Sequence, residues 1–272
     1  MQVNFLGTGA SEGIPNPFCS CHICELSRIH KGYDVRTRSS VVIDNRLQID
    51  IAPEYTYQLM RDCLDAREIR SLLFTHTHPD HFNIGELYSR MVGFSHNISH
   101  PLNVFGNDLA ITKCAALLEN FSHERIRLHK IVPFTTTETH GYRITPLLAN
   151  HALWEFCYVY LIEKGGKVVF YGHDSGWFPE LTWRYLKNNK IDLCILECTI
   201  GYNGNNRTDG HMSFETIIDV KENLKSLGCL GKTSEVILSH ISHNVKMSHA
   251  EIESNMSPHD IKVAYDGLIV VV

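Results

Sequence analysis

The sequence predicts an α/β fold, and three observations lead to this prediction. Short apolar runs typical of buried strands alternate with segments typical of amphipathic helices along all 272 residues. No internal repeat, low-complexity tract or linker divides the chain, so we expect a single domain over 1–272. Strand after strand ends in a histidine or an aspartate, and chemistry is usually carried on loops at one edge of packed sheets.

Composition and charge narrow the class of protein. With 43% hydrophobic and 20% charged residues, the chain suits a globular protein with a substantial core. The net charge of −5 and the absence of a long basic run argue against a nucleic-acid partner. The N-terminus lacks the features of a signal peptide, and no apolar stretch reaches the roughly 18 residues that span a bilayer. We therefore expect a cytoplasmic protein without a membrane partner.

The expected elements follow from apolar periodicity and turn residues. Strands are predicted over 3–9, 39–51, 71–74, 102–105, 125–134, 141–148, 156–163, 167–171, 191–196, 235–238, 261–265 and 267–272. The first runs into a glycine turn, and the second is a pair of strands joined by a tight turn at Asp44-Asn45. A hairpin across 164–166 joins two others. Helices are predicted over 54–64, 85–94, 108–120, 179–188 and 213–227, the last capped by Ser213 and Thr216.

The segment that follows the strand 71–74 is the strongest indication of function. It places His76, His78, Asp80 and His81 within six residues, and imidazole and carboxylate are the usual ligands of zinc, manganese and iron. Side chains alternate in a strand, so His76 and His78 point to the same side. A turn at Pro79 would carry Asp80 and His81 toward a second point about 3.5–4 Å away, as in two-metal sites. A surface turn that is histidine-rich by chance is the weaker alternative.

Other candidate ligands also follow predicted strands. His151 comes directly after the strand 141–148, where a core histidine and a ligand are equally plausible. Asp174 is at the centre of the loop 172–176, and His240 follows the strand 235–238. Asp50, at the end of another strand, is either near the metals or a turn residue.

Cys19, Cys21 and Cys24 lie within six residues, whereas the other six of the nine cysteines are scattered among apolar neighbours. Without an export signal, such a cluster indicates metal binding more than disulfides. Three thiolates would fill three corners of a closed, structural zinc site in a loop over about 15–26, which its prolines make irregular. The fourth ligand would be His22 or a residue far along the chain. Three free thiols are the alternative.

The H-x-H-x-D-H run at 76–81, with the later Asn-His, Asp and C-terminal His, resembles the metallo-β-lactamase fold along the whole chain. The resemblance implies an αββα sandwich with a dinuclear site at one edge of its sheets. It implies that one metal is held by His76, His78 and His151. It also implies that the other is held by Asp80, His81 and His240, with Asp174 as the bridge.

Two further features narrow this resemblance, and the first, in the cysteine loop and the C-terminal histidines, resembles the cyclic-phosphate phosphodiesterase of the carbon–phosphorus lyase pathway. The cysteine cluster together with His240-Ile241-Ser242-His243 implies a structural zinc on Cys19, Cys21, Cys24 and His243. The stretch Gly210-His211-Met212-Ser213 resembles one that phosphodiesterases of this fold, including transfer-RNA 3′ processing endonuclease, carry before the last helix. It implies that His211 contacts phosphate and protonates the leaving oxygen, with Glu197 as its partner. The implied catalytic residues are His211, Asp80 and Glu197.

The resulting expectation is a metal-dependent phosphoric diester hydrolase. Two manganese or zinc ions would lower the pKa of a shared water, giving a hydroxide that attacks a small cyclic phosphodiester. The resemblance implies phosphoribosyl 1,2-cyclic phosphate or a 2′,3′-cyclic nucleotide as substrate. The alternatives are a transfer-RNA processing enzyme, a thioester or lactam hydrolase, and a metal-dependent scaffold. His211, and the absence of a Gly-Gly pair after His81, disfavour the thioester and lactam reading. The oligomeric state stays open, a homodimer included.

Overall fold

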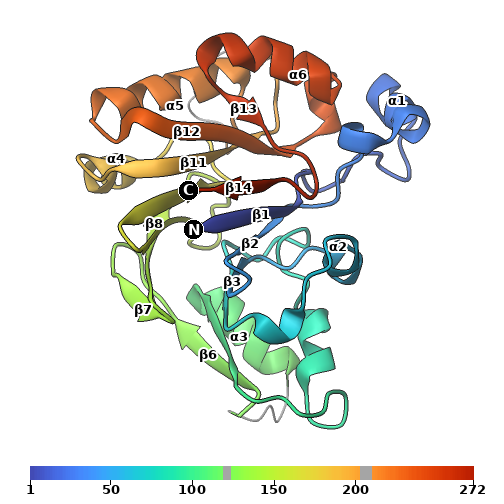
Figure 1. Cartoon of the computed structure of the whole chain (residues 1–272), viewed down its shortest axis with the longest axis vertical. Coiled ribbons are helices and arrows are strands. Elements are labelled where there is room, and N and C mark those ends of the chain that lie inside the picture. Colours follow the sequence, from blue (N-terminus) through green and yellow to red (C-terminus); the bar gives the residue numbers. More distant parts are fainter. Residues whose placement is uncertain (119–123, 203–209) are drawn as a thin grey trace.

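The computed structural model describes residues 1–118, 124–202 and 210–272, and in it two seven-stranded sheets pack face to face (Figure 1). The first sheet has the order β14-β1-β2-β3-β4-β5-β6 and is parallel from β3 to β6. Its strands are β1 (Gln2–Gly7), β2 (Ser40–Ile43), β3 (Leu47–Ile49), β4 (Ser71–Leu73), β5 (Leu102–Gly106), β6 (Ile126–Lys130) and β14 (Ile269–Val271).

The second sheet has the order β13-β12-β11-β10-β9-β8-β7 and is parallel from β13 to β10. Its strands are β7 (Thr137–Thr139), β8 (Tyr142–Leu148), β9 (Tyr158–Lys164), β10 (Lys167–Gly172), β11 (Ile191–Cys198), β12 (Leu230–Ile241) and β13 (Lys262–Val263). Because β10, β11 and β12 run parallel, the residues that follow them emerge at one edge of the sheet.

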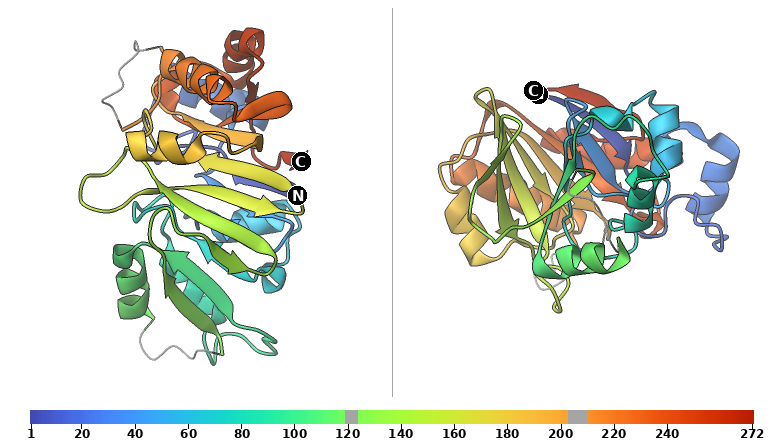
Figure 2. Two further views of the ribbon diagram at one scale, coloured as in Figure 1. Left: turned by 90° about the vertical axis from the view of Figure 1, so that its left-hand side faces the viewer. Right: turned by 90° about the horizontal axis from the view of Figure 1, so that it is seen from below.

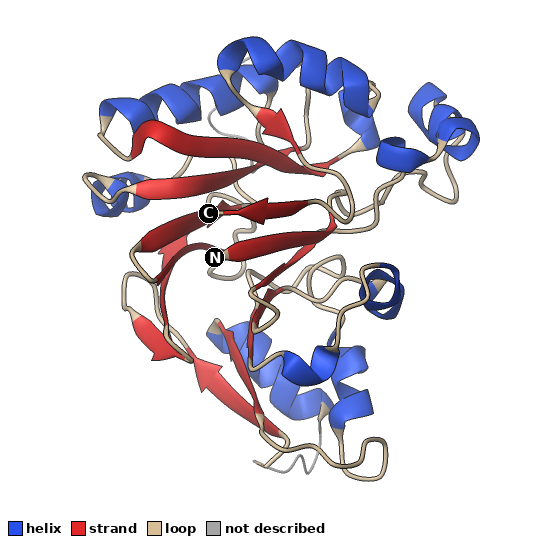
Figure 3. Cartoon of the chain, in the orientation of Figure 1, coloured by secondary structure: helices blue, strands red, loops and turns tan. Residues whose placement is uncertain are grey.

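Helices cover both outer faces of the pair of sheets, which confirms the predicted αββα sandwich (Figure 3). The first sheet carries α2 (Tyr55–Arg61) and α3 (Asp108–Leu117), and the second carries α4 (Glu180–Leu186), α5 (Phe214–Ser226) and α6 (His249–Met256). Helix α1 (His22–His30) stands out from the body of the sandwich (Figure 2). Short 3₁₀ turns complete the fold: Gly32–Asp34, Ala66–Glu68, Ile84–Arg90, His243–Val245 and Ser257–His259. Within the described ranges, no helix has the length and apolar character needed to cross a bilayer.

Strand alternation divides the core into three layers. Val41 and Ile43 of β2 face the second sheet and join the central cluster, whereas Val42 between them packs toward the helices on the outer face. The same alternation separates Val169 and Tyr171 of β10, which lie in the central layer, from Phe170, which packs under the outer helices. Both faces of the central strands are thus buried, which explains why these strands read as continuous apolar runs.

Some elements differ from the prediction. The segment expected as a helix over 85–94 is a 3₁₀ turn, Ile84–Arg90, and the predicted helix 108–120 ends at Leu117. Residues 119–123 and 203–209 lie outside the described residues, and they include the predicted end of that helix and most of the predicted loop 201–210. The loop around 15–26 is irregular only up to Cys21, because α1 begins at His22, and the prediction does not include α1, α6 or β7.

The chain does not form a tight turn at Gly7-Thr8-Gly9. Gly9 pairs instead with Arg38 and with Ile241 of β12, so the segment links the two sheets. A Cβ on Gly7 would lie 1.9 Å from the Arg38 carbonyl oxygen, which is why glycine is required there. The predicted Asp44-Asn45 turn is confirmed, with both residues in the left-handed region (φ +51° and +53°).

Asp44 ties this turn to the second sheet. Its carboxylate accepts hydrogen bonds from Gln2 N (2.7 Å), Tyr142 OH (2.8 Å) and Lys164 Nζ (2.8 Å). Burial opposes the charge, but the bond from Lys164 and the others outweigh it and lower the pKa of Asp44. The carboxylate is therefore more stable in the folded chain than in the unfolded one.

We expect Asp44→Asn to lower the free energy of unfolding by about 1 kcal/mol at pH 7, because the site is partly exposed. Asparagine keeps the left-handed turn and removes only the charge. A depressed folded pKa contributes stability above the unfolded pKa that is lost as the pH falls through the folded pKa. Urea titrations from pH 7 to pH 3 should therefore show the two proteins converging in acid. A constant difference across this range would contradict the assignment.

Candidate functional site

The first group of candidate ligands comprises three histidines from both sheets. His76 and His78 leave the end of β4, and His151 follows β8. His78 Nδ1 lies 2.9 Å from His76 Nε2 and 3.0 Å from His151 Nε2, so three imidazole nitrogens face one point. The Nδ1 atom of His151 lies 3.2 Å from the Gly210 carbonyl oxygen, which holds the proton on Nδ1 and leaves Nε2 free to bind a cation.

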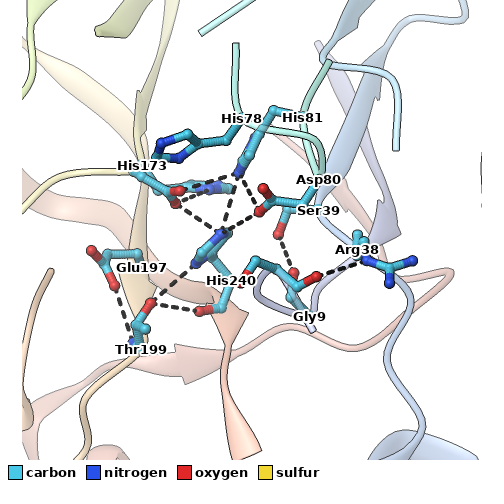
Figure 4. Close-up of polar contacts among 12 residues, drawn as sticks. Gly9, Arg38, Ser39, His78, Asp80, His81, His173, Glu197, Thr199 and His240 are labelled. Carbon is cyan, nitrogen blue, oxygen red and sulfur yellow. Dashed lines mark hydrogen bonds and ion pairs between the residues drawn. The ribbon is translucent and has the colours of Figure 1, made fainter. Parts of the chain in front are cut away.

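The second group comprises Asp80, His81, Asp174 and His240, all buried. His81 Nε2 lies 3.0 Å from Asp80 Oδ2 and 3.2 Å from Asp174 Oδ2, and His240 Nε2 lies 3.0 Å from Asp174 Oδ1. Figure 4 shows the His240 ring between Thr199 on one side and Asp80 and His81 on the other.

Asp174 lies between the two groups. Its Oδ2 atom is 3.8 Å from His76 Nε2 and 3.9 Å from His151 Nε2, in addition to its contacts with His81 and His240. The Oδ1 atom is buried, and although His240 Nε2 lies 3.0 Å away, no described residue donates to Oδ1 with the angles of a hydrogen bond. A buried carboxylate oxygen without a donor is costly unless a cation is present.

The donor set fits two divalent cations. Five imidazoles and two carboxylates, the ligands that zinc and manganese accept, converge at one buried edge of the sandwich. Burial opposes the charge on Asp80 and Asp174, yet the neighbouring His81 and His240 hold the pKa of both carboxyls below the usual value. Both carboxylates are therefore ionised, and they would compensate part of the charge of two cations.

Asp50 and Thr75 orient the histidines from behind. Asp50 is fully buried, and its Oδ2 lies 2.7 Å from His81 Nδ1 and accepts a hydrogen bond from Thr75 Oγ1 (2.8 Å). Thr75 Oγ1 is in turn 3.0 Å from His76 Nδ1. One carboxylate thus fixes ring orientation in both groups, as carboxylates behind metal-binding histidines do. Asp50 is a neighbour of the ligands and not a simple turn residue.

A β-bulge aims His240 into the site. Glu197 of β11 pairs with Ser239 and the next residue, Cys198, pairs with Ile241, so His240 is the extra residue and adopts φ +51°. Thr199 Oγ1 lies 3.1 Å from His240 Nδ1 and holds the ring in place. The role of Thr199 could not be predicted from the sequence, where its only notable feature is that it follows Glu197-Cys198 at the end of a strand.

His211 lies at the mouth of the site, beside His151 of the first group and His240 of the second. Its Nδ1 is 2.9 Å from Glu197 Oε1, and its ring is 4.9 Å from that of His151 and 6.1 Å from that of His240. The His211 side chain is 32% exposed, whereas Glu197 is fully buried. Burial works against the imidazolium, but the Glu197 carboxylate outweighs it and raises the pKa of His211. The pair is suited to present a protonated imidazole to a substrate.

The cysteine cluster lies apart from this edge, at the start of α1. Cys24 Sγ is 3.3 Å and Cys21 Sγ is 3.7 Å from His243 Nδ1, and Cys19 completes a group of four possible ligands. The His243 amide donates to Glu12 Oε1 (3.1 Å), which positions the turn that carries the ring. Of the two sources considered for the fourth ligand, the structure brings the distant His243 to the thiols. His22 is exposed on α1 and is not part of the group.

His173 lies directly behind Asp174 and is fully buried. Neither ring nitrogen has a hydrogen-bond partner among the described residues, and burial lowers its pKa well below the usual value. Its ring packs 4.1 Å from that of Tyr171, so it is a neutral core histidine beside the site.

A sandwich of two sheets with such a His/Asp edge defines a metal-dependent hydrolase of the metallo-β-lactamase fold. A family model described as a beta-lactamase superfamily domain matches residues 45–241. The chain belongs to this family. The matched segment runs from β3 to the end of β12 and contains both groups of ligands, and the cysteine cluster precedes it.

Among curated proteins, the chain is 24% identical over 281 residues to an octanoyltransferase of Porphyromonas gingivalis. The match covers 98% of this chain and 51% of that protein, so the chain spans about half the length of the curated relative it matches. The relative's name describes the whole, longer protein.

Solved structures share the fold over nearly the entire chain. Zn²⁺-bound PqqB from Methylobacterium extorquens superposes with a TM-score of 0.77 at 18% identity, covering 100% of both chains. A diphosphatase of the PhnP family gives 0.76 at 20% identity, covering 100% of this chain and 97% of that chain. The short form of human tRNase Z gives 0.71 at 17% identity, covering 100% and 99%. At these identities the similarity establishes the fold.

Proposed function

We propose that the protein is a dinuclear-metal phosphodiesterase that hydrolyses a small cyclic phosphodiester. The observation that carries the proposal is the His211–Glu197 pair, whose ring faces the metal-ligand groups across the mouth of the site. A phosphodiester needs a proton donor for its departing oxygen, and imidazole suits that role near neutral pH. The structural similarity to a PhnP-family diphosphatase and to tRNase Z supports phosphoryl chemistry.

Each residue of the site then has a task. His76, His78 and His151 would hold one metal, Asp80, His81 and His240 the other, and Asp174 both. When bound, two divalent cations activate water and neutralise charge on the phosphoryl oxygens. Asp50, Thr75 and Thr199 keep the ligand rings in register, so little reorganisation is needed during the reaction. His211 holds a proton on the side from which the substrate enters, and Glu197 keeps it charged.

Turnover of bis-p-nitrophenyl phosphate by the metal-loaded protein is the first test of this proposal. Comparing adenosine 2′,3′-cyclic phosphate, phosphoribosyl 1,2-cyclic phosphate and a precursor transfer RNA would then separate the substrate classes. We expect cyclic diesters to be hydrolysed and the precursor to be spared. No turnover of any phosphodiester, with two metals bound at the His/Asp edge, would overturn the proposal.

Acyl-thioester hydrolysis is the second candidate, and it is favoured by the name of the curated relative, an octanoyltransferase. An octanoyl thioester assayed beside the cyclic diesters distinguishes the two. We rank it second because acyl transfer does not require a charged imidazole such as His211 at the mouth of the site.

We also propose that Cys19, Cys21, Cys24 and His243 hold one structural zinc. Such a closed four-ligand site would fasten α1 to the turn after β12, and His243 lies only three residues from His240. The end of β12 and the turn after it would therefore carry one ligand of each kind of site.

Metal content tests the structural zinc. Cys21→Ser is expected to lower the metal content from about three to about two per chain while most phosphodiesterase activity remains, because the catalytic ligands are untouched. Cys63→Ser is the matched control, since Cys63 is an exposed free thiol away from the cluster. Two metals in both the wild type and Cys21→Ser would exclude a structural zinc.

A further inference from the structure

The loop that follows His151 exposes large apolar side chains beside the metal-ligand groups. Leu153 is 97% exposed, Trp154 68% and Phe156 58%. Single exposed apolar residues are common on protein surfaces, but three of them within four positions form a patch that needs an explanation. Because these residues follow directly on His151, the patch lies at the entrance to the site.

A partly buried hydrogen-bond network holds this loop in place. Glu155, between Trp154 and Phe156, accepts hydrogen bonds from Thr77 N (3.0 Å) and Thr77 Oγ1 (2.8 Å) through one oxygen, and from Asn107 Nδ2 (2.8 Å) through the other. Asn107 also donates to the Phe156 carbonyl oxygen (2.8 Å) and caps α3. Thr77 lies between His76 and His78, so one carboxylate fastens the loop to the metal-binding turn itself.

This anchoring fixes Trp154 against a ligand ring. The centroids of Trp154 and His78 are 5.4 Å apart, with the two planes inclined at 50°. The ring centroids of His78 and His151 are in turn 4.8 Å apart. The indole is therefore at the rim of the site, with one side against the first ligand group and much of its surface open to solvent.

The chemistry of the rim favours a flat, apolar group on the substrate. Trp154 lies beside His78, so the organic substituent of a phosphodiester bound at the His/Asp edge would be within reach of the loop 152–156. An indole face binds a nucleobase by stacking, whatever the base, whereas a sugar phosphate needs cations and hydrogen-bond donors. The side chains of this loop are Ala152, Leu153, Trp154 and Phe156, and the single carboxylate, on Glu155, is already engaged by Thr77 and Asn107.

We propose that Trp154 is a specificity-determining residue that stacks on the nucleobase of the substrate, with Glu155 as the residue that positions its loop. The inference rests on the proposed phosphodiesterase function and narrows it, because it selects nucleoside 2′,3′-cyclic phosphates over base-free cyclic sugar phosphates.

Steady-state kinetics test the specificity. Trp154→Ala should raise KM for adenosine 2′,3′-cyclic phosphate roughly ten-fold. Trp154→Phe should keep KM close to the wild-type value, because stacking needs only an aromatic face. KM for phosphoribosyl 1,2-cyclic phosphate should change less than about two-fold. The control is Tyr57→Ala, which removes an exposed aromatic ring on α2. Equal effects on both substrates, or no effect on either, would overturn the inference.

A binding measurement keeps this test independent of turnover. Adenosine 3′-monophosphate should quench tryptophan fluorescence in the metal-loaded wild type and in Trp177→Phe, but not in Trp154→Phe. Quenching without hydrolysis of any phosphodiester would show that the stacking site exists and that the proposed reaction is wrong. Quenching that persists in Trp154→Phe would show that the base does not contact Trp154.

Discussion

Asp174→Asn is expected to reduce kcat for a phosphodiester by roughly 10³-fold and to lower the metal content of the His/Asp edge from two toward one. Asp174 is the residue whose carboxylate lies within 4 Å of His76, His81, His151 and His240. An amide of the same shape keeps the packing but removes the negative charge and one acceptor oxygen, so it cannot serve two cations equally. The loss should exceed that caused by a change in any one histidine of a group.

The control for Asp174→Asn must change charge in the same way elsewhere. Asp260→Asn does so, because Asp260 is exposed and left-handed (φ +51°), a conformation that asparagine tolerates. Metal analysis and phosphodiesterase activity of the two variants should diverge while their unfolding curves stay similar. If Asp174→Asn retained two metals and more than about a tenth of the activity, Asp174 would not be the shared ligand.

The candidate site is recognisable in the sequence largely because its candidate ligands follow strands. The chain places four candidate ligands within six residues: His76, His78, Asp80 and His81. The alternation of side chains in a strand and a turn at proline are enough to bring them together. His151, Asp174 and His240 are distant from that turn, and their convergence follows from parallel strands that end at one edge. The resemblance to a known fold supplied their pairing into two groups.

What the sequence does not reveal depends on backbone detail. His240 reaches the site through a bulge, and an extra residue in one strand leaves no pattern in the apolar periodicity. Asp50 orients His81 and has a left-handed backbone conformation. Aspartate tolerates this conformation, but an aspartate in the sequence does not predict it. Trp154 is informative only once its exposure beside His78 is known.

The two helices that were not predicted, α6 and α1, differ in whether the sequence contains a signal for their first residue. Helix α6 begins with a complete capping box, Ser248 and Glu251, a four-residue start signal that the sequence does contain. Helix α1 begins at His22, and the side chain of its N-cap residue, Cys21, makes no capping hydrogen bond, so the usual start signal is absent. Its first turn carries Cys24, and metal binding by the cluster would stabilise a helix that propensity alone does not specify.

His211→Ala is expected to reduce kcat by about 10²–10⁴-fold on a diester with a poor leaving group while both catalytic metals stay bound. The ring is 32% exposed and not part of either ligand group around Asp174, so both groups should stay intact, and an unfolding curve measures the cost of leaving the buried Glu197 without its partner. A diester with a p-nitrophenolate leaving group needs little protonation, so the same variant should lose much less activity on bis-p-nitrophenyl phosphate. His96→Ala, at an exposed histidine, is the control and should resemble wild type on both substrates.

Glu197→Gln separates the proton donor from a merely structural histidine. The Glu197 carboxylate raises the pKa of His211, so the imidazole stays protonated to higher pH than a free histidine. Glutamine keeps a polar contact but removes the charge that stabilises the imidazolium, and the pKa of His211 should fall. Because the acid form is the active one, the alkaline limb of the kcat/KM profile should move to lower pH in Glu197→Gln and be absent in His211→Ala. A profile whose alkaline limb is the same in all three proteins would assign the proton to another group, and the departing oxygen would then be protonated from a source other than His211.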